Sequence, residues 1–261
     1  MKLIAVAALL VSSACTTLGP MPATTGISAV PADRPGFEAQ AAIVPAFYLS
    51  SAAEGSNAGN ATGQLSILVE PDRWLGIPGL VVGAREFGQS GDTLVEPYIG
   101  LRRRVGDGVS LAAIGYGTET TSAASGASYS ATRLGTELAA DVQLLELAGW
   151  VSLHWQVSAS FTDIEASGSY CIAGGGAATD CQNDGTDTRA NGNVSGIFPA
   201  GTAQLSLDLG HRPSGVFHDA RLAVLASAGQ MPQLSFGQQE AQRATYTSWG
   251  LSLTLGLGAE H

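Results

Sequence analysis

Hydrophobic and polar residues alternate along the carboxyl-terminal stretch, from Tyr246 to Ala259. Thr247, Trp249, Leu251, Leu253, Leu255, Leu257 and Ala259 fall on one face, and Tyr246, Ser248, Gly250, Ser252, Thr254, Gly256 and Gly258 on the other. Side chains alternate across a β-strand, so the pattern predicts a two-faced strand. It is longer than the usual globular strand of about 5–6 residues and covers the roughly 9–11 residues that a tilted strand needs to cross a bilayer.

The same period recurs through the chain. Val151, Leu153, Trp155, Val157, Ala159 and Phe161 alternate with Ser152, His154, Gln156, Ser158 and Ser160. Two segments are less clear: 128–144 also satisfies a helical period, and 109–118 has no clean apolar face. The pattern predicts strands at 37–49, 64–74, 79–87, 93–104, 109–118, 128–144, 148–164, 201–211, 216–228 and 244–259.

The connections between these segments alternate in length. Those after even-numbered strands are expected to be short, as at 106–108, and those after odd-numbered strands longer, as at 165–200. This pattern predicts an all-β fold at 37–259, a transmembrane antiparallel up-and-down β-barrel of about ten strands, with eight as the alternative. A soluble sandwich also alternates, but its outer face would carry more Lys and Glu than these Ser, Thr and Gly.

The segment Ser248–Leu255 resembles the carboxyl-terminal recognition signal of bacterial outer-membrane β-barrel proteins. In that signal a polar residue is followed by Gly two positions later and then by spaced apolar residues, here Ser248, Gly250, Leu253 and Leu255. The family usually ends at an aromatic residue, whereas this chain continues to His261. The resemblance implies recognition by the barrel-assembly machinery, contact with outer-membrane lipid and location in the outer membrane of a Gram-negative bacterium.

The amino terminus has the layout of an export signal. Lys2 precedes an apolar run from Leu3 to Val11 and then small residues, so we expect a signal peptide at 1–14. Val11 to Cys15 resembles a bacterial lipoprotein cleavage box, which implies lipidation of Cys15, although Ser12 replaces the usual Leu and ordinary secretion stays open. Residues 15–36 are rich in Pro and Thr and are expected to form a periplasmic tether, with both termini of the chain on the periplasmic side.

Composition narrows the partners. If Cys15 bears a lipid, Cys171 and Cys181 remain as a pair suited to a disulfide in an oxidising compartment. We expect no metal site and no cofactor. The net charge of −10 argues against nucleic acid as a partner.

Charged residues within the strands share the face opposite most apolar residues and are expected to point into the lumen. These residues are Glu70, Arg85, Glu96, Arg102, Arg104, Arg133, Glu137, Asp141, Asp208, Asp219 and Arg221. They predict either an ion-paired core that fills the interior or a constricted path, lined by arginines, that attracts small anions. Arg103 breaks the parity and is expected on the outer face near the periplasmic interface.

Catalysis has little support in the sequence. His154 lies within a strand on the polar face, and we expect no serine and carboxylate to converge on it, so it is interpreted as a hydrogen-bonded lumen residue and the chain as no enzyme. The favoured function is a structural or interaction role in the cell envelope, such as that of a subunit of a larger surface assembly with other envelope proteins. The alternatives are a narrow anion-favouring channel and, third, a hydrolase at the barrel rim.

Overall fold

The computed structural model describes ten long strands and one short one. The described residues are 16–18, 27–30, 36–50, 61–71, 75–89, 92–124, 127–172, 188–209, 217–235 and 242–258. The strands are β1 (Thr16–Leu18), β2 (Gly36–Ser50), β3 (Ala61–Val69), β4 (Leu80–Gln89), β5 (Asp92–Gly106), β6 (Val109–Ala124), β7 (Ala127–Ala148), β8 (Val151–Ile172), β9 (Thr188–Asp208), β10 (Phe217–Ser235) and β11 (Gln242–Gly258). Among the described residues, no helix is long and apolar enough to cross a membrane.

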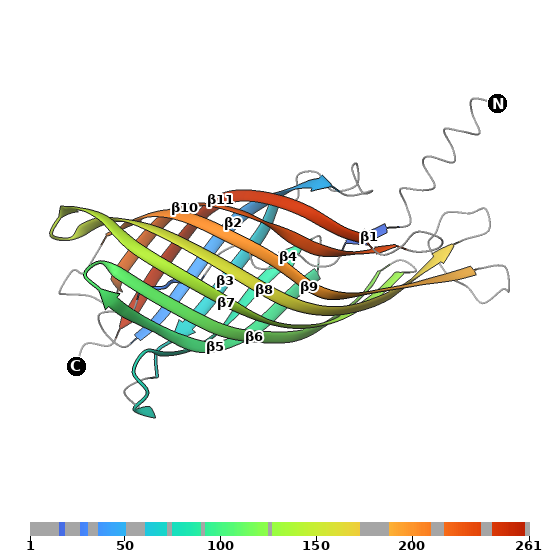
Figure 1. Cartoon of the computed structure of the whole chain (residues 1–261), viewed down its shortest axis with the longest axis horizontal. Helices are drawn as coiled ribbons and strands as arrows, with labels where there is room; N and C mark the ends of the chain where they lie inside the picture. The colour runs from blue at the N-terminus through green and yellow to red at the C-terminus, as the bar shows by residue number, and fades with distance from the viewer. Residues whose placement is uncertain are drawn as a thin grey trace, which may run out of the picture.

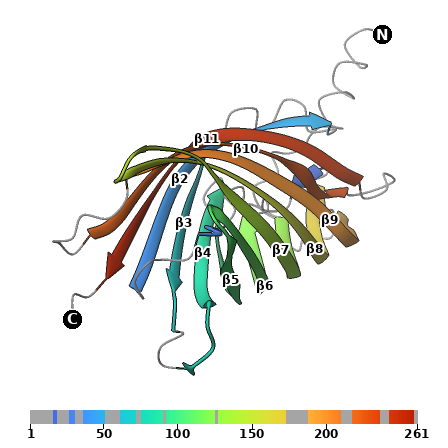
Figure 2. The same cartoon turned by 60° about the vertical axis from the view of Figure 1, so that its left-hand side comes forward.

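Strands β2 to β11 form one closed antiparallel barrel (Figures 1 and 2). Each strand pairs with the next along the chain, β11 pairs with β2, and the β9–β10 pairing completes the wall. Through the part that crosses the bilayer, closure pairs each strand on both sides, which is the only way in which strands can cross with their backbone groups satisfied. The prediction of a ten-stranded transmembrane barrel is therefore confirmed, and the soluble sandwich is excluded.

The large apolar side chains point outward from this wall. Trp249 and Leu251 in β11 are 59% and 57% exposed, whereas the intervening Ser252 is 2% exposed. β7 is a strand throughout, despite its helical period, and Leu134 and Leu138 lie on its outer face. A closed antiparallel barrel with an apolar outer wall and a polar interior is the architecture of outer-membrane proteins, and the chain is an outer-membrane β-barrel.

One end of the barrel, here called the turn end, has the connections at 107–108 and 149–150; Gly36 and Gly258 pair there at the ends of β2 and β11. The opposite end, the loop end, has the connections at 51–60, 173–187 and 236–241. The predicted difference in connection length is smaller than expected, because β6 continues through Ala124 and β7 begins at Ala127. By the outer-membrane pattern the turn end faces the periplasm.

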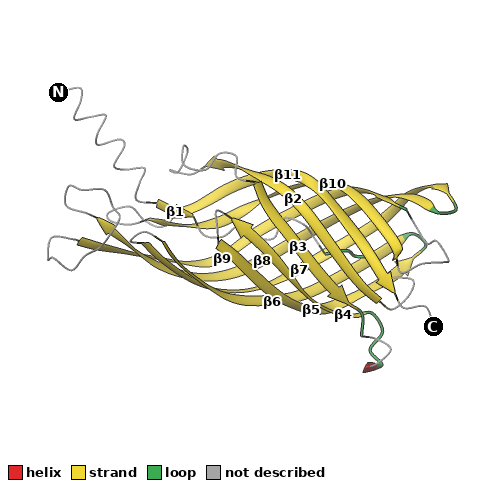
Figure 3. Ribbon diagram, turned by 180° about the vertical axis from the view of Figure 1, so that it is seen from behind, coloured by secondary structure: helices red, strands yellow, loops and turns green. Residues whose placement is uncertain are grey.

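Three neighbouring strands rise well beyond the bilayer at the loop end. β7, β8 and β9 contain 22, 22 and 21 residues, roughly twice what a tilted strand needs to cross. The outer face of β8 changes from apolar to charged between Phe161 and Asp163, both exposed, and Glu165 follows on the same face. Because the exposed Leu134 and Ile197 are the partners of Asp163 in the neighbouring strands, we place the outer boundary of the membrane near Phe161 and Asp163. The upper parts of these strands project at the loop end (Figure 3).

Part of the amino-terminal segment lies inside the barrel. Ile27 and Ala29 are 4% and 0% exposed and pack with Leu68, Tyr98 and Ala139 of the barrel wall. This differs from the expected periplasmic tether at 15–36, because the interior offers hydrogen-bond partners and apolar contacts to this segment. The expected signal peptide at 1–14, the lipidation site Cys15 and the expected disulfide partner Cys181 lie outside the described residues, as does the side chain of Cys171.

Candidate functional site

An ion-pair network occupies the middle of the barrel interior. Arg85 in β4 donates from Nε to Oε1 of Glu96 at 2.6 Å and from Nη1 to Oε2 of Glu137 at 2.7 Å. Its guanidinium also lies over the Tyr116 ring, 4.5 Å from the ring centroid. Arg133 approaches the other oxygen of Glu96 at 3.8 Å. The strand register brings these residues together, since Arg85 pairs directly with Glu96 across β4 and β5.

Two further networks lie toward the turn end. Arg102 in β5 pairs with Glu70 and, at 2.9 Å, with Glu38. Arg221 in β10 pairs with Asp208 at 2.8 Å and lies 4.0 Å from Asp141. Both arginines are almost completely buried, so each guanidinium has exchanged water for carboxylates, as a buried charge requires.

The interior residues predicted from strand parity lie inside the barrel. They are Glu70, Arg85, Glu96, Arg102, Arg133, Glu137, Asp141, His154, Asp208 and Arg221, all buried except the half-buried Asp208. Arg104 is an exception: it is exposed where β5 ends, so its expected lumen position is wrong. The backbone of Asp219 is in β10, and its side chain lies outside the described residues.

The buried amino-terminal segment, residues 27–30, is bound by side chains from the barrel wall. The backbone N–H of Ile27 donates to Glu137 at 2.9 Å. Gln156 in β8 holds two positions, accepting from the N–H of Ala29 at 3.2 Å and donating to the carbonyl of Ile27 at 2.7 Å. Arg102 and Arg221 donate to the Ser28 carbonyl and hydroxyl at 3.5 and 3.4 Å. The N–H groups of Ile27 and Ala29 and the carbonyls of Ile27 and Ser28 are thus satisfied by side chains in place of a neighbouring strand.

His154 contacts both a serine and a carboxylate. Its Nε2 lies 2.9 Å from Oγ of Ser152, and its Nδ1 lies 2.7 Å from Oδ1 of Asp141. The expectation that no such pair converges on His154 is therefore wrong. Ser152 is two residues earlier on the same face of β8, and the register places Asp141 of β7 opposite Gln156, one step along that face. The period of two and the β7–β8 hairpin were the signals that could have found this group.

The interior becomes apolar toward the loop end. Ile164 and Phe198 are each 1% exposed and pack with Ala131 and Ala166. Nearby, Tyr246 and Met231 form a second cluster with Ala244. Charged networks in the lower part of the lumen and packed apolar side chains in the upper part together occupy its length.

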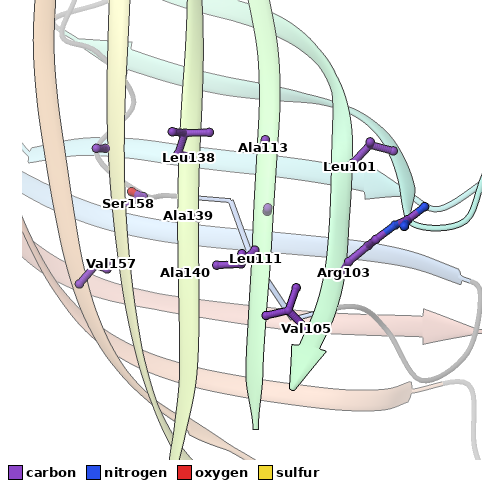
Figure 4. Close-up of a pocket in the computed structure, with 12 residues that line it drawn as sticks. Leu101, Arg103, Val105, Leu111, Ala113, Leu138, Ala139, Ala140, Val157 and Ser158 are labelled. Carbon is purple, nitrogen blue, oxygen red and sulfur yellow. The ribbon is translucent and has the colours of Figure 1, made fainter. Parts of the chain in front are cut away.

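The outer wall has an apolar depression across β5 to β8 (Figure 4). Leu101, Leu111, Leu138 and Val157 surround small residues, among them Ala113 and Ala140. Arg103 lies at its rim, exposed as predicted, and donates to the Pro78 carbonyl at 3.3 Å. This surface suits the acyl chains of membrane lipid, with Arg103 at the level of the head groups.

Among the described residues, no group of three or more His, Cys, Asp and Glu is arranged to hold a metal ion. Sequence reasoning missed the contributions of Glu38, Gln156 and residues 27–30. The parity rule already places Gln156 on the inner face of β8, but the segment at 27–30 has no regular period that would mark it as part of the interior.

No protein-family model and no curated protein matches the chain. Its fold is similar to that of several solved outer-membrane proteins. For Neisserial surface protein A the TM-score is 0.32 at 9% identity, covering 84% of this chain and 94% of that one. For the toluene transporter TodX of P. putida the TM-score is 0.32 at 9% identity, covering 89% and 92%. For Ail, the attachment invasion locus protein of Yersinia pestis, it is 0.28 at 10% identity, covering 85% and 97%. At such identities the likeness concerns the fold alone.

Proposed function

We propose that this outer-membrane barrel is a closed structural or interaction protein of the cell envelope and not a constitutive pore. The occupied interior is the observation that supports this proposal. Arg85, Arg102 and Arg221 are held by carboxylates, and residues 27–30 lie bound among them. An ion that crossed this interior would have to displace several buried ion pairs, each of which is expensive to break.

The charge balance also disfavours the anion-selective path. Within the described ion pairs, the arginines Arg85, Arg102, Arg133 and Arg221 face the acids Glu38, Glu70, Glu96, Glu137, Asp141 and Asp208. Carboxylates outnumber guanidinium groups, so the interior has no excess of positive charge to attract an anion, unlike the rings of Arg or Lys in anion pores.

The projecting part of β7, β8 and β9 is the element best suited to contact another envelope protein. Its outer face is polar above the level of Leu134, Asp163 and Ile197, with Thr132, Glu165 and Ser195 exposed, while its inner face packs the apolar Ile164 cluster. This rigid, water-facing sheet stands clear of the lipid and can be reached by a neighbouring protein.

Planar-bilayer recording tests the closed state. The full chain is expected to give no lasting conductance. Steady conductance that disappears in Arg102→Ala and Arg133→Ala variants would instead support the channel. A photo-crosslinking residue at Glu165, with Asp107 at the turn end as the matched control, tests the interaction role in cells. Crosslinks at Glu165 to a discrete envelope protein are expected; their absence, together with an open pore, would contradict the proposal.

A second candidate function is hydrolysis at Ser152, and the contacts of His154 favour it. With the Nδ1 proton donated to Asp141, Nε2 is left to accept the hydroxyl proton of Ser152, which is the arrangement of a Ser-His-Asp triad. Ser152 is half-buried near the turn end, so any substrate would enter from the periplasmic side.

A fluorophosphonate probe, which reacts with activated serines, tests this candidate. Labelling of the purified full chain that is lost in Ser152→Ala and in His154→Ala would support a hydrolase. Ser167→Ala is the control, because Ser167 is exposed on the outer face of the same strand. Absence of labelling in the folded wild-type chain would reduce the three residues to a hydrogen-bonded part of the interior.

A further inference from the structure

The amino-terminal segment has three described positions, and they lie at different depths of the barrel. Gly36 begins β2 at the turn end, where it pairs with Gly258. Residues 27–30 lie in the interior among Glu137, Gln156 and Arg221. β1 pairs with Gln233–Ser235, the last residues of β10, at the loop end. In Figure 1, β1 accordingly lies at the opposite end of the barrel from the point where β11 ends.

The direction of β1 agrees with this order. β10 runs from the turn end to the loop end, and β1 is antiparallel to it, with Thr16 opposite Ser235 and Leu18 opposite Gln233. The chain therefore runs inward from Thr16 to Leu18, toward the interior position of Ile27. An extended chain advances up to about 3.3–3.6 Å per residue, so the stretch from Leu18 to Ile27 can span about 30 Å, enough for the roughly 25 Å apolar band of such barrels.

The barrel wall provides an open place for β1. Strand β9 pairs with β10 only from Arg221 to Gly229, and β9 then continues upward along β8 alone. Beyond Gly229, β10 still pairs with β11 along one edge, but β9 no longer pairs along the other edge. Strand β1 pairs with β10 on that second edge. An unpaired strand edge presents free N–H and C=O groups, so this short strand satisfies an edge that the barrel itself leaves open.

We propose that the amino-terminal segment passes through the barrel from the loop end to the turn end, so that Thr16 lies at the outer surface of the cell. Cys15 precedes Thr16 directly. A lipid on Cys15 would then reach the outer leaflet of the outer membrane and not the periplasmic leaflet. This inference goes beyond the closed barrel: an interior segment could also close the lumen if it entered and left at the turn end.

Thiol labelling in intact cells tests the proposed path. In a full-length chain with Cys171→Ser and Cys181→Ser, Thr17→Cys is expected to react with a membrane-impermeant maleimide as completely as Thr121→Cys, an exposed position near the loop end. Asp107→Cys, in the exposed connection at the turn end, should react only after the outer membrane is permeabilised. The parent chain without added cysteines reports any reaction of Cys15 itself.

A second measurement tests the pairing of β1 independently. Leu18 and Gln233 are direct Cα partners, at the separation of antiparallel neighbours that a disulfide can bridge. The Leu18→Cys, Gln233→Cys chain should form this disulfide in cells, detected by mass spectrometry, and the Leu18→Cys, Gln230→Cys chain should not. Labelling of Thr17→Cys only after permeabilisation, without the Leu18–Gln233 disulfide, would overturn the proposal. That result would leave the closed lumen, tested by conductance, unaffected.

Discussion

Replacement of Arg85 by methionine should destabilise the barrel strongly, because Arg85 is the link between two buried glutamates. It donates to Glu96 and Glu137, which are 0% and 3% exposed. Removal of one partner from a buried ion pair typically costs about 3–5 kcal/mol. Both glutamates keep a second contact, Glu96 with Arg133 and Glu137 with the N–H of Ile27. We therefore expect the low end, about 3 kcal/mol, or roughly a hundredfold change in the unfolding equilibrium.

The comparison variants separate charge from packing. Adding Glu96→Gln and Glu137→Gln to Arg85→Met removes the two buried negative charges that have lost their arginine partner. This triple variant should therefore recover much of the lost stability. Arg103→Met is the matched control: Arg103 is exposed on the outer face, and its loss should change stability by at most about 0.5 kcal/mol.

Urea unfolding of the refolded barrel in lipid vesicles measures these differences, with the fluorescence of the lipid-facing Trp155 and Trp249 as the signal. The reasoning would be refuted if Arg85→Met unfolded at the wild-type urea concentration. It would also fail if the triple variant were less stable than the single one, since the cost would then not arise from uncompensated charge.

Two further pairs of substitutions test the packing of the wall and its depth in the membrane. A Cβ on Gly135 would lie 2.5 Å from the Tyr116 ring, whereas one on Gly115, in the adjacent strand, meets nothing nearer than 4.0 Å. Gly135→Ala should thus cost about 1–3 kcal/mol by overpacking and Gly115→Ala much less; equal urea midpoints would contradict the described packing of Tyr116. Leu251→Arg, on the lipid-facing side of β11, should cost about 2–4 kcal/mol in vesicles, and Val105→Arg, where β5 ends, only about 0–1. Similar costs at both positions would argue against the assigned membrane depth.

The sequence predicts the wall of the barrel well, because most strand residues obey one rule, with exceptions such as Arg104 where β5 ends. The period of two assigns Leu251 to lipid and Ser252 to the interior, and the structure agrees at both. It succeeds even in β7, where Leu134 and Leu138 also fit a helix, since the neighbouring strands supply the hydrogen bonds that a strand needs.

The contents of the interior are harder to predict, because they depend on register between strands. Parity places Asp141 inside and Ser152 beside His154 on the inner face, but only the pairing of β7 with β8 shows that Asp141 meets them. The lengths of the connections also depend on pairing between strands. Ser, Thr and Ala at 119–124 read as a loop, yet β7 offers partners along this whole stretch and the strand continues.

The position of residues 27–30 follows from no hydrophobic period in the sequence. It follows from the hydrogen-bond partners that interior side chains of the barrel wall need. The interior acids outnumber the arginines, and one of them, Glu137, accepts a hydrogen bond from the backbone of Ile27. Gln156, buried on β8, finds both a donor and an acceptor in the same segment. Without residues 27–29, these side chains would need water or new partners in the closed lumen. The barrel interior is therefore complementary to a piece of its own chain, which makes the segment part of the fold and not a tether attached to it.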